Sequence, residues 1–494
     1  MNRNVRILTI IMTLCFLALF AQLIRLHLIQ REDLQANPNN TRSIVSEFSQ
    51  ERGLIKTADG VVIAESQEVQ NELRYERHYA YEDLYAHITG YFSFLYGSVG
   101  LERSYDDLLA SHNKEKPLEI TTTINHSIQQ KAKEALGNRN GSAVVLNPQT
   151  GEILAMWSYP SYNPNSLSSS DLDAVQDAWG QLSEIPVSND PRLERTYREL
   201  YFPGSTFKIV TAAAALLSDK ATLTQPDFEN RNEYLPPLTD LPLQNYGGGI
   251  CGGNILEGLR VSCNSIFAEL AAEIIGAKAM IETSERFGFN QTIPIDLPFS
   301  IPSVFPSNFG DPIGEINAFS IPILEKTPGL AQAGIGQFDV KATPLQMALV
   351  AAAVSNDGLI MKPYIIDSYK TETMGSMKVN KPEVWKSALP TETARSLKFA
   401  METIVKNGTA NRMKVTGAVI GGKTGTAQVD SSRPDDTHGW VIGFGGPKEG
   451  PSTVAIAVLV ESIPNEGQNT GGFDAAPIAQ IVLEETLRIQ GYIN

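Results

Sequence analysis

A serine and a lysine three residues apart could supply the nucleophile and the base of an acyl-transfer site. Ser205 follows the turn signal Pro203-Gly204, and the Ala-rich run 209–216 after it predicts a helix. Lys208 would lie one helical turn beyond Ser205, on the same face. A serine hydroxyl becomes a good nucleophile when a base takes its proton, and lysine can be that base if burial or a neighbouring cation lowers its pKa.

One Ser-x-x-Lys pair is a weak signal by itself. The spacing recurs at Ser111 and Lys114, and the ordinary interpretation of any single copy is a helix-capping serine beside a solvated lysine. Two further patterns follow Ser205 in the chain, Ser262-Cys263-Asn264 and Lys423-Thr424-Gly425-Thr426. Ser-x-Asn also recurs, whereas Lys-Thr-Gly occurs once. The three patterns in this order match the active-site set of penicillin-recognising serine acyltransferases.

The sequence of residues 201–208, Tyr-Phe-Pro-Gly-Ser-Thr-Phe-Lys, closely resembles the penicillin-binding proteins. Arg52-Gly53-Leu54-Ile55 and Gly100-Leu101-Glu102 resemble segments of the class B proteins, and the short first region that opens with residues 37–42 is most like the actinobacterial PbpA type. The resemblance covers nearly the whole chain. It implies a mixed α/β transpeptidase fold, with a five-stranded antiparallel sheet flanked by helices, behind a small elongated pedestal domain and one N-terminal transmembrane helix.

Four segments are expected along the chain: a cytoplasmic tail (1–6), a transmembrane anchor (7–29), a dimerisation-like pedestal (30–138) and the transpeptidase domain (139–494). The run 7–24 is almost wholly apolar and approaches the ~20 residues that cross a bilayer. It is long for a signal peptide, and Leu19-Phe20-Ala21 is a poor cleavage site, which favours an uncleaved anchor. Arginines follow the run, so charge does not set its orientation. The resemblance implies a single-pass protein of the cell membrane with an extracytoplasmic catalytic domain.

Alternation, apolar periodicity and turn residues predict several elements of the two larger domains. In the pedestal, two short strands flank Asp59-Gly60, a strand covers 120–124 and a helix covers 129–136. In the catalytic domain we expect strands at 142–147, 152–158, 440–444 and 454–460, and helices at 266–275, 343–354 and 479–489. Glu82-Asp83 and His87 are similar to an acidic motif of glycan polymerases, but their spacing fits it poorly, so no glycosyltransferase activity is expected.

Composition excludes several classes of function. The formal net charge of −15 argues against nucleic acid as a partner. Six histidines and three cysteines show no metal-ligand spacing, so neither a metal nor a cofactor is expected. Cys251 and Cys263 lie near and within the Ser-x-Asn pattern. Outside the cytoplasm they could form a disulfide, and two free thiols are the alternative.

The resemblance implies a role for each motif residue. Ser205 would attack the carbonyl between the last two D-alanines of a peptidoglycan stem peptide, with Lys208 as the general base. Lys423 would help to keep Lys208 neutral and would attract the substrate carboxylate. Ser262 would relay a proton to the leaving amine, and Asn264 would hydrogen-bond the peptide backbone.

The Lys-Thr-Gly-Thr pattern would bind the end of the substrate. The hydroxyls of Thr424 and Thr426 would hold the terminal carboxylate. The backbone amides of Ser205 and Thr426 would form the oxyanion hole, and Gly425 would allow close approach of the backbone.

Three functions remain open on these motifs. The first is a D,D-transpeptidase that β-lactams inhibit covalently, working beside a SEDS-family glycan polymerase. The second is a D,D-carboxypeptidase, which would share every motif. The third is a non-catalytic scaffold or β-lactam sensor, which the intact motifs disfavour. A β-lactamase would need a means of activating water, and no Glu-x-x-Leu-Asn segment is present.

Overall fold

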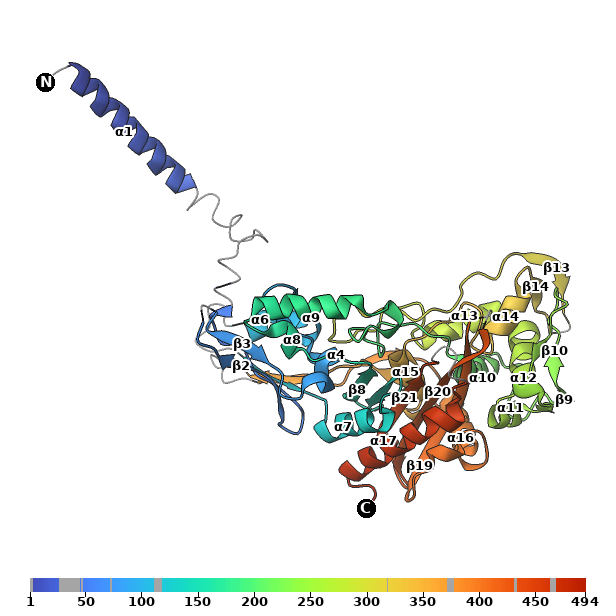
Figure 1. Ribbon diagram of the computed structural model, residues 1–494. Helices are drawn as coiled ribbons and strands as arrows, with labels where there is room; N and C mark the ends of the chain where they lie inside the picture. Colours follow the sequence, from blue (N-terminus) through green and yellow to red (C-terminus); the bar gives the residue numbers. More distant parts are fainter. Residues whose placement is uncertain are drawn as a thin grey trace.

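The structure is a computed structural model that describes residues 3–25, 45, 48–71, 73–110, 118–317, 319–370, 377–430, 433–462 and 468–494. The polar segment 37–40, the end of the expected anchor at 26–29 and the second Ser-x-x-Lys copy at Ser111 and Lys114 lie outside these residues. An N-terminal helix, a first region rich in short strands and a larger catalytic body follow one another in the chain (Figure 1).

Helix α1 (Arg3–Ile24) confirms the expected apolar N-terminal helix. Its 22 residues rise by about 33 Å, which matches the hydrocarbon core of a bilayer. None of its side chains is buried against the rest of the protein. The helix is therefore long and apolar enough to cross a membrane.

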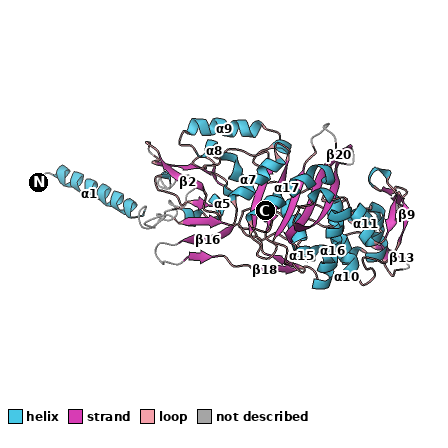
Figure 2. Ribbon diagram, turned by 90° about the horizontal axis from the view of Figure 1, so that it is seen from below, coloured by secondary structure: helices cyan, strands magenta, loops and turns pink. Residues whose placement is uncertain are grey.

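The first region is built on a six-stranded sheet whose order is β17-β16-β6-β1-β2-β3. Strands β1 (Ile55–Lys56) and β2 (Val62–Glu68) are the pair expected around Asp59-Gly60, and β3 (Tyr75–His78) continues the sheet. Strand β6 (Glu119–Thr122) pairs with β1 in parallel. The outer strands, β16 (Ile366–Lys370) and β17 (Met377–Val379), come from the distant catalytic part of the sequence (Figure 2).

A buried cluster of opposite charges lies beside this sheet. Glu102, in helix α5 (Gly100–Ser104), is fully buried and accepts hydrogen bonds of 2.6 Å from the Nε atoms of both Arg52 and Arg77. Arg52 also pairs with Asp106 at 2.7 Å. Burial acts to raise the pKa of Glu102, but the two arginines outweigh it and leave that pKa below its usual value.

The catalytic body is organised on a five-stranded sheet of order β19-β20-β21-β7-β8, and every neighbouring pair is antiparallel. The strands are β19 (Ala418–Asp430), β20 (Arg433–Pro447), β21 (Val454–Val460), β7 (Gly141–Leu146) and β8 (Ile153–Tyr159). The expected five-stranded antiparallel sheet is thus confirmed. All residues of β21 are buried, as are all 12 residues of helix α15 (Pro344–Ser355), which packs on β21.

Further helices enclose the sheet and extend it on one side. Helices α7 (His126–Leu136) and α17 (Ala476–Ile489) pack on each other, and α16 (Thr391–Asn407) packs along β19. A mainly helical lobe lies beyond β19, at the end of the molecule away from the first region (Figure 1). It contains α10 (Lys208–Leu217), α11 (Ile255–Val261), α12 (Asn264–Glu269) with the π-helical turn Leu270–Ile275, α13 (Ala277–Arg286) and α14 (Thr327–Ala333). The three motifs meet between this lobe and β19.

Candidate active site

Ser205 lies in a single 3-10 turn (Gly204–Phe207) directly before α10, rather than in the α-helix itself. The turn is held against β19. Gly204 has φ +51°, and a Cβ at this position would lie 2.8 Å from the carbonyl oxygen of Thr426. Glycine is needed here because an L side chain would be both strained and in contact with β19. The Ser205 backbone is therefore fixed beside the Lys-Thr-Gly-Thr strand.

Lys208 is the first residue of α10 and has no exposed surface. Its Nζ donates to the carbonyl oxygen of Ser262 at 2.8 Å and to Asn264 Oδ1 at 2.6 Å. Burial, together with the charge of Lys423, holds the pKa of Lys208 well below its usual value. A lysine with a lowered pKa is neutral more often than an ordinary lysine at the same pH, and a neutral amine can accept a proton.

Lys423, on β19, is also fully buried, and its Nζ donates to Ser262 Oγ at 2.8 Å and to the Thr424 carbonyl at 2.8 Å. Burial lowers the pKa of Lys423 to about 7. Ser262 thus accepts a hydrogen bond from Lys423 on its hydroxyl oxygen and one from Lys208 on its carbonyl oxygen. It adopts the left-handed conformation at φ +64°, which costs a non-glycine residue ~1 kcal/mol or more.

The Ser-x-Asn segment is tied to residues 244–251. Asn264 Nδ2 donates to the Gln244 carbonyl at 2.9 Å, and the Ser265 amide donates to Asn245 Oδ1 at 2.9 Å. Cys263 forms a disulfide with Cys251, with their Cα atoms 6.0 Å apart. The middle residue of the motif is therefore covalently held.

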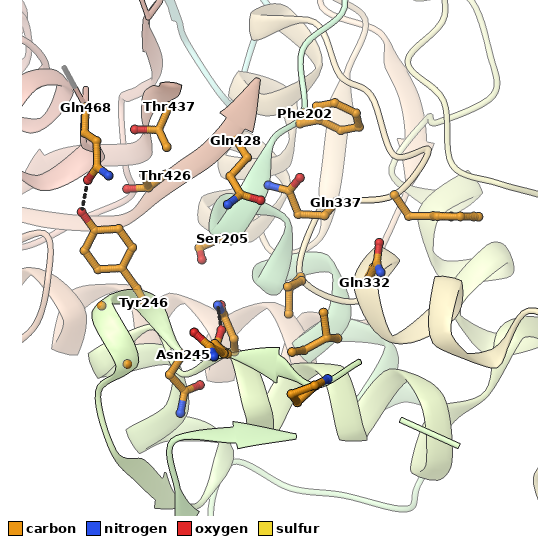
Figure 3. A pocket seen from close by; sticks show the side chains of 18 of the residues that line it. Phe202, Ser205, Asn245, Tyr246, Gln332, Gln337, Thr426, Gln428, Thr437 and Gln468 are labelled. Carbon is orange, nitrogen blue, oxygen red and sulfur yellow. Dashed lines mark hydrogen bonds between the residues drawn. The ribbon is translucent and has the colours of Figure 1, made fainter. Parts of the chain in front are cut away.

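The two threonines of the Lys-Thr-Gly-Thr strand have different surroundings. Thr426 lines the cleft beside Ser205 (Figure 3). The hydroxyl of Thr424, in contrast, donates to Thr409 Oγ1 at 2.6 Å, and Thr424 is not part of the cleft lining. Between them, a Cβ on Gly425 would lie 2.9 Å from Thr206 Cγ2 and 3.0 Å from the Pro203 carbonyl, so only glycine allows the strand to come this close.

The cleft over Ser205 has a volume of about 1070 Å³. Its lining is rich in neutral amides, among them Gln244, Gln332, Gln337, Gln428 and Gln468. Figure 3 shows Gln337 and Gln428 beside the cleft over Ser205. Tyr246 donates from its hydroxyl to Gln468 Oε1 at 3.2 Å. Sequence reasoning missed these residues, because a single glutamine or tyrosine carries no motif. Among the described residues, no three His, Cys, Asp or Glu side chains are placed to hold a metal ion.

Two family models match the chain. The penicillin binding protein transpeptidase domain matches residues 141–484, and the penicillin binding protein A dimerisation domain matches residues 52–134. The peptidoglycan D,D-transpeptidase PbpA of Mycolicibacterium smegmatis is 34% identical, with 99% of each chain covered. PbpA of Mycobacterium tuberculosis is 32% identical, also with 99% of each chain covered.

Solved structures are similar over most of the described chain. The imipenem acyl-enzyme of penicillin-binding protein A from M. tuberculosis has a TM-score of 0.77 at 31% identity, covering 89% of this chain and 100% of that one. The penicillin G acyl-enzyme of the same protein has a TM-score of 0.77 at 32% identity, with the same coverage. From its motifs, its fold and these comparisons, the chain belongs to the class B penicillin-binding proteins.

Proposed function

We propose that this protein is a peptidoglycan D,D-transpeptidase that cross-links stem peptides through an acyl-enzyme on Ser205. The observation that carries the proposal is the buried pair Lys208 and Lys423, with Ser262 between them, beside the Ser205 turn. The relatives named D,D-transpeptidase and the β-lactam acyl-enzymes of the M. tuberculosis protein support it.

In the first half-reaction, Lys208 takes the proton of Ser205 as Oγ attacks the carbonyl between the two terminal D-alanines. A positioned general base contributes about 10²–10⁴-fold to the rate. The backbone amides of Ser205 and Thr426 stabilise the oxyanion, where one donor is worth about 10²–10³-fold. Ser262 passes a proton to the leaving D-alanine amine, and the ester on Ser205 remains.

Substrate binding follows from the residues around this centre. Thr426 binds the terminal carboxylate, aided by the charge of Lys423, and Asn264 hydrogen-bonds the peptide backbone. Thr424 joins Thr426 in this role when its hydroxyl turns away from Thr409. In the second half-reaction, the amine of a second stem peptide attacks the ester and gives the cross-link, while attack by water would give a D,D-carboxypeptidase product.

The cellular arrangement is also proposed. Helix α1 anchors the protein in the cell membrane as a single span, with the catalytic domain (139–494) outside the cytoplasm on the pedestal (30–138). A SEDS-family glycan polymerase is the proposed membrane partner. The apolar α1 supports the membrane anchor, and the match to a dimerisation domain at residues 52–134 supports the pedestal.

The test is covalent labelling of the full chain in detergent with benzylpenicillin, followed by peptide mass spectrometry. We expect a stable penicilloyl group on Ser205 that is absent from Ser205→Ala. Rapid drug loss without an adduct would instead indicate a β-lactamase, and neither adduct nor drug loss in a folded protein would favour a scaffold. With a D-Ala-D-Ala donor and an amine acceptor, hydrolysis alone would count for the carboxypeptidase.

A further inference from the structure

A short segment with attached ends and a glycine-rich centre lines one side of the cleft. We call residues 244–251 the strap. Both of its ends are attached to the Ser-x-Asn loop, through the Gln244 carbonyl and the Asn245 side chain at one end and the Cys251 disulfide at the other. Its centre is Tyr246 followed by three glycines, residues 247–249. Gly247 and Gly248 have φ of +62° and +69°, and a Cβ on either would meet open space.

One side chain of the strap reaches the opposite wall of the cleft. Tyr246, whose residue surface is 62% exposed, donates from its hydroxyl to Gln468 Oε1 at 3.2 Å. The segment that carries Gln468 is fixed to β20, because Thr437 Oγ1 donates to the Asn469 carbonyl at 2.8 Å and the Asn469 amide donates to the Thr437 carbonyl at 3.2 Å. The Tyr246–Gln468 pair therefore bridges the Ser-x-Asn wall and the sheet wall.

The bridge lies on a definite side of Ser205. In Figure 3, Tyr246 and Gln468 lie on the side where Thr426 and Thr437 are found, while Phe202, Gln337 and Gln332 lie toward the other side. If Thr426 holds the terminal carboxylate of the donor, as proposed above, the bridged side receives the leaving D-alanine. The acceptor amine must approach the ester from that same side, because its attack is the chemical reverse of the departure of an amine.

We propose that Tyr246 and Gln468 are positioning residues for the acceptor stem peptide. With the bridge closed over the acyl-enzyme, they hold the acceptor against the ester and limit the access of water. Orientation of two reactants and exclusion of water both favour aminolysis over hydrolysis. The inference rests on the proposed transpeptidase function, and it names the element that decides between cross-linking and trimming.

The bridge is weak enough to open during each turnover. A hydrogen bond between neutral, exposed groups contributes little net stability, so its closed and open forms interconvert readily. The glycines let the centre of the strap move while its ends stay attached to the motif. Opening of the bridge admits a peptide carried on a polymer from the side, and closing then holds it.

The experiment measures how the acyl-enzyme partitions. The full chain in detergent receives a D-Ala-D-Ala donor peptide and an amine acceptor, and the ratio of aminolysis to hydrolysis products is determined. Tyr246→Phe and Gln468→Ala each remove one half of the bridge and are expected to lower the ratio by about two- to tenfold, the factor for one hydrogen bond. The double variant should lose no more than the worse single variant. The matched control is Tyr492→Phe, an exposed tyrosine at the C-terminus.

The outcomes separate the two proposals. If the wild-type protein forms the acyl-enzyme and both variants give the same partition ratio as the control, the positioning role is wrong and the proposed function stands. A wild-type protein that forms no acyl-enzyme overturns both. Because the readout is a ratio of products from one intermediate, a general loss of folded protein does not change it, whereas a lost acceptor site does.

Discussion

Two buried clusters of charged side chains lie in the two halves of this protein and are built on opposite plans. In the first region, Glu102 is enclosed by Arg52 and Arg77, so unlike charges face each other at hydrogen-bond distance. In the active site, Lys208 and Lys423 are both fully buried around Ser262, and within the part of the chain that the structure describes no carboxylate accepts a hydrogen bond from either Nζ. The first cluster keeps its charges, whereas the second lowers the pKa values of both amines.

This contrast separates a structural cluster from a reactive one. Removing one partner of a buried charge pair leaves the other charge uncompensated and is strongly destabilising. We therefore expect the arginine–glutamate cluster to be needed for the stability of the fold. A buried amine without a counter-ion instead has a lowered pKa and is more often neutral, so it can accept a proton, at a cost to stability that the rest of the fold must offset. Desolvation of a charged group is therefore compensated by opposite charges in the first region, whereas in the active site it lowers the pKa of the amines that the chemistry needs.

Replacing Lys208 by methionine should have the largest effect on activity. Acylation of Ser205 by benzylpenicillin should fall by about 10²–10⁴-fold, because the general base is lost. The thermal midpoint should stay equal or rise, because a desolvated amine has been removed. Lys220→Met, on the exposed surface just after α10, serves as the control and should acylate normally. A variant that unfolds while the control does not would contradict the view of Lys208 as a functional rather than a structural residue.

Replacing Glu102 by glutamine should have the largest effect on stability. The buried Arg77 and Arg52 would both lose the charge of Glu102, although Arg52 would still pair with Asp106, and the free energy of unfolding should fall by about 3–5 kcal/mol. The measurement is a denaturant titration beside Glu68→Gln, an exposed site at the end of β2 where about 0.5 kcal/mol or less is expected. Acylation per folded molecule should be kept in both variants. Equal stability of the two would show that the fold does not need the cluster for its stability.

Removing the disulfide should have an intermediate effect on stability. Changing both Cys251 and Cys263 to serine opens a link between residues 12 apart in sequence and should cost about 2–3 kcal/mol. Because Cys263 lies between Ser262 and Asn264, the acylation rate should fall as well. Mass spectrometry with and without reductant establishes the bond in the native protein. Alkylation of both thiols without reductant would contradict this prediction.

The pH dependence of the acylation rate should show a smaller effect that tests the interaction between the two lysines directly. Acylation needs neutral Lys208, so its rate should fall as the pH drops through the lowered pKa of that amine. Lys423→Met removes a like charge, which raises the pKa of Lys208 and moves the acid limb to higher pH. The readout is the position of the limb, not the height of the profile. A limb that stays in place would mean that burial alone sets the pKa of Lys208.

Stability should rise with pH because of Lys423, in the same sense as for a carboxylate whose pKa is lowered on folding, but in an alkaline window. The pKa of Lys423 is about 7 in the folded chain and near its usual value of about 10.5 when unfolded. Between these values the unfolded chain binds more protons, so stability should rise with pH across that window. The Lys423→Met variant should show a flatter profile in the same thermal melts.

The structure links Lys208, Ser262, Asn264 and Lys423 by hydrogen bonds and places Ser205 with Asn264 in the lining of one cleft. Their catalytic roles stay predictions, but the sequence predicted that these five residues belong to one site. It could do so because their order and spacing are informative without knowledge of the fold. The direction of the Thr424 hydroxyl toward Thr409 could not be predicted, because it depends on a neighbour from another element. Tyr246 and Gln468 were missed for the same reason, since their partnership spans 222 residues of chain.

Strand β19, which carries the Lys-Thr-Gly-Thr pattern, was not predicted. Of the other strands of the catalytic sheet, β7, β8, β21 and the middle of β20 were predicted, because they are apolar and end at clear turns. Helix α9 (Leu172–Glu184) was not, since it lies in a largely polar stretch and buries only Val175. Strands β16 and β17 were also not predicted. They carry no signal that assigns them to the first region, because strand pairing between distant segments depends on the whole fold.

That shared sheet has a consequence for how the chain is made. Strand β6 borders β1 on one side and β16 on the other, and β16 begins at Ile366. A growing chain therefore leaves the edge of β6 open until more than 200 further residues have been added. An open strand edge invites pairing with other chains, and late closure of distant contacts slows folding. Fragments that end near residue 138 should aggregate, and the newly made protein should depend on holding chaperones until its catalytic half arrives.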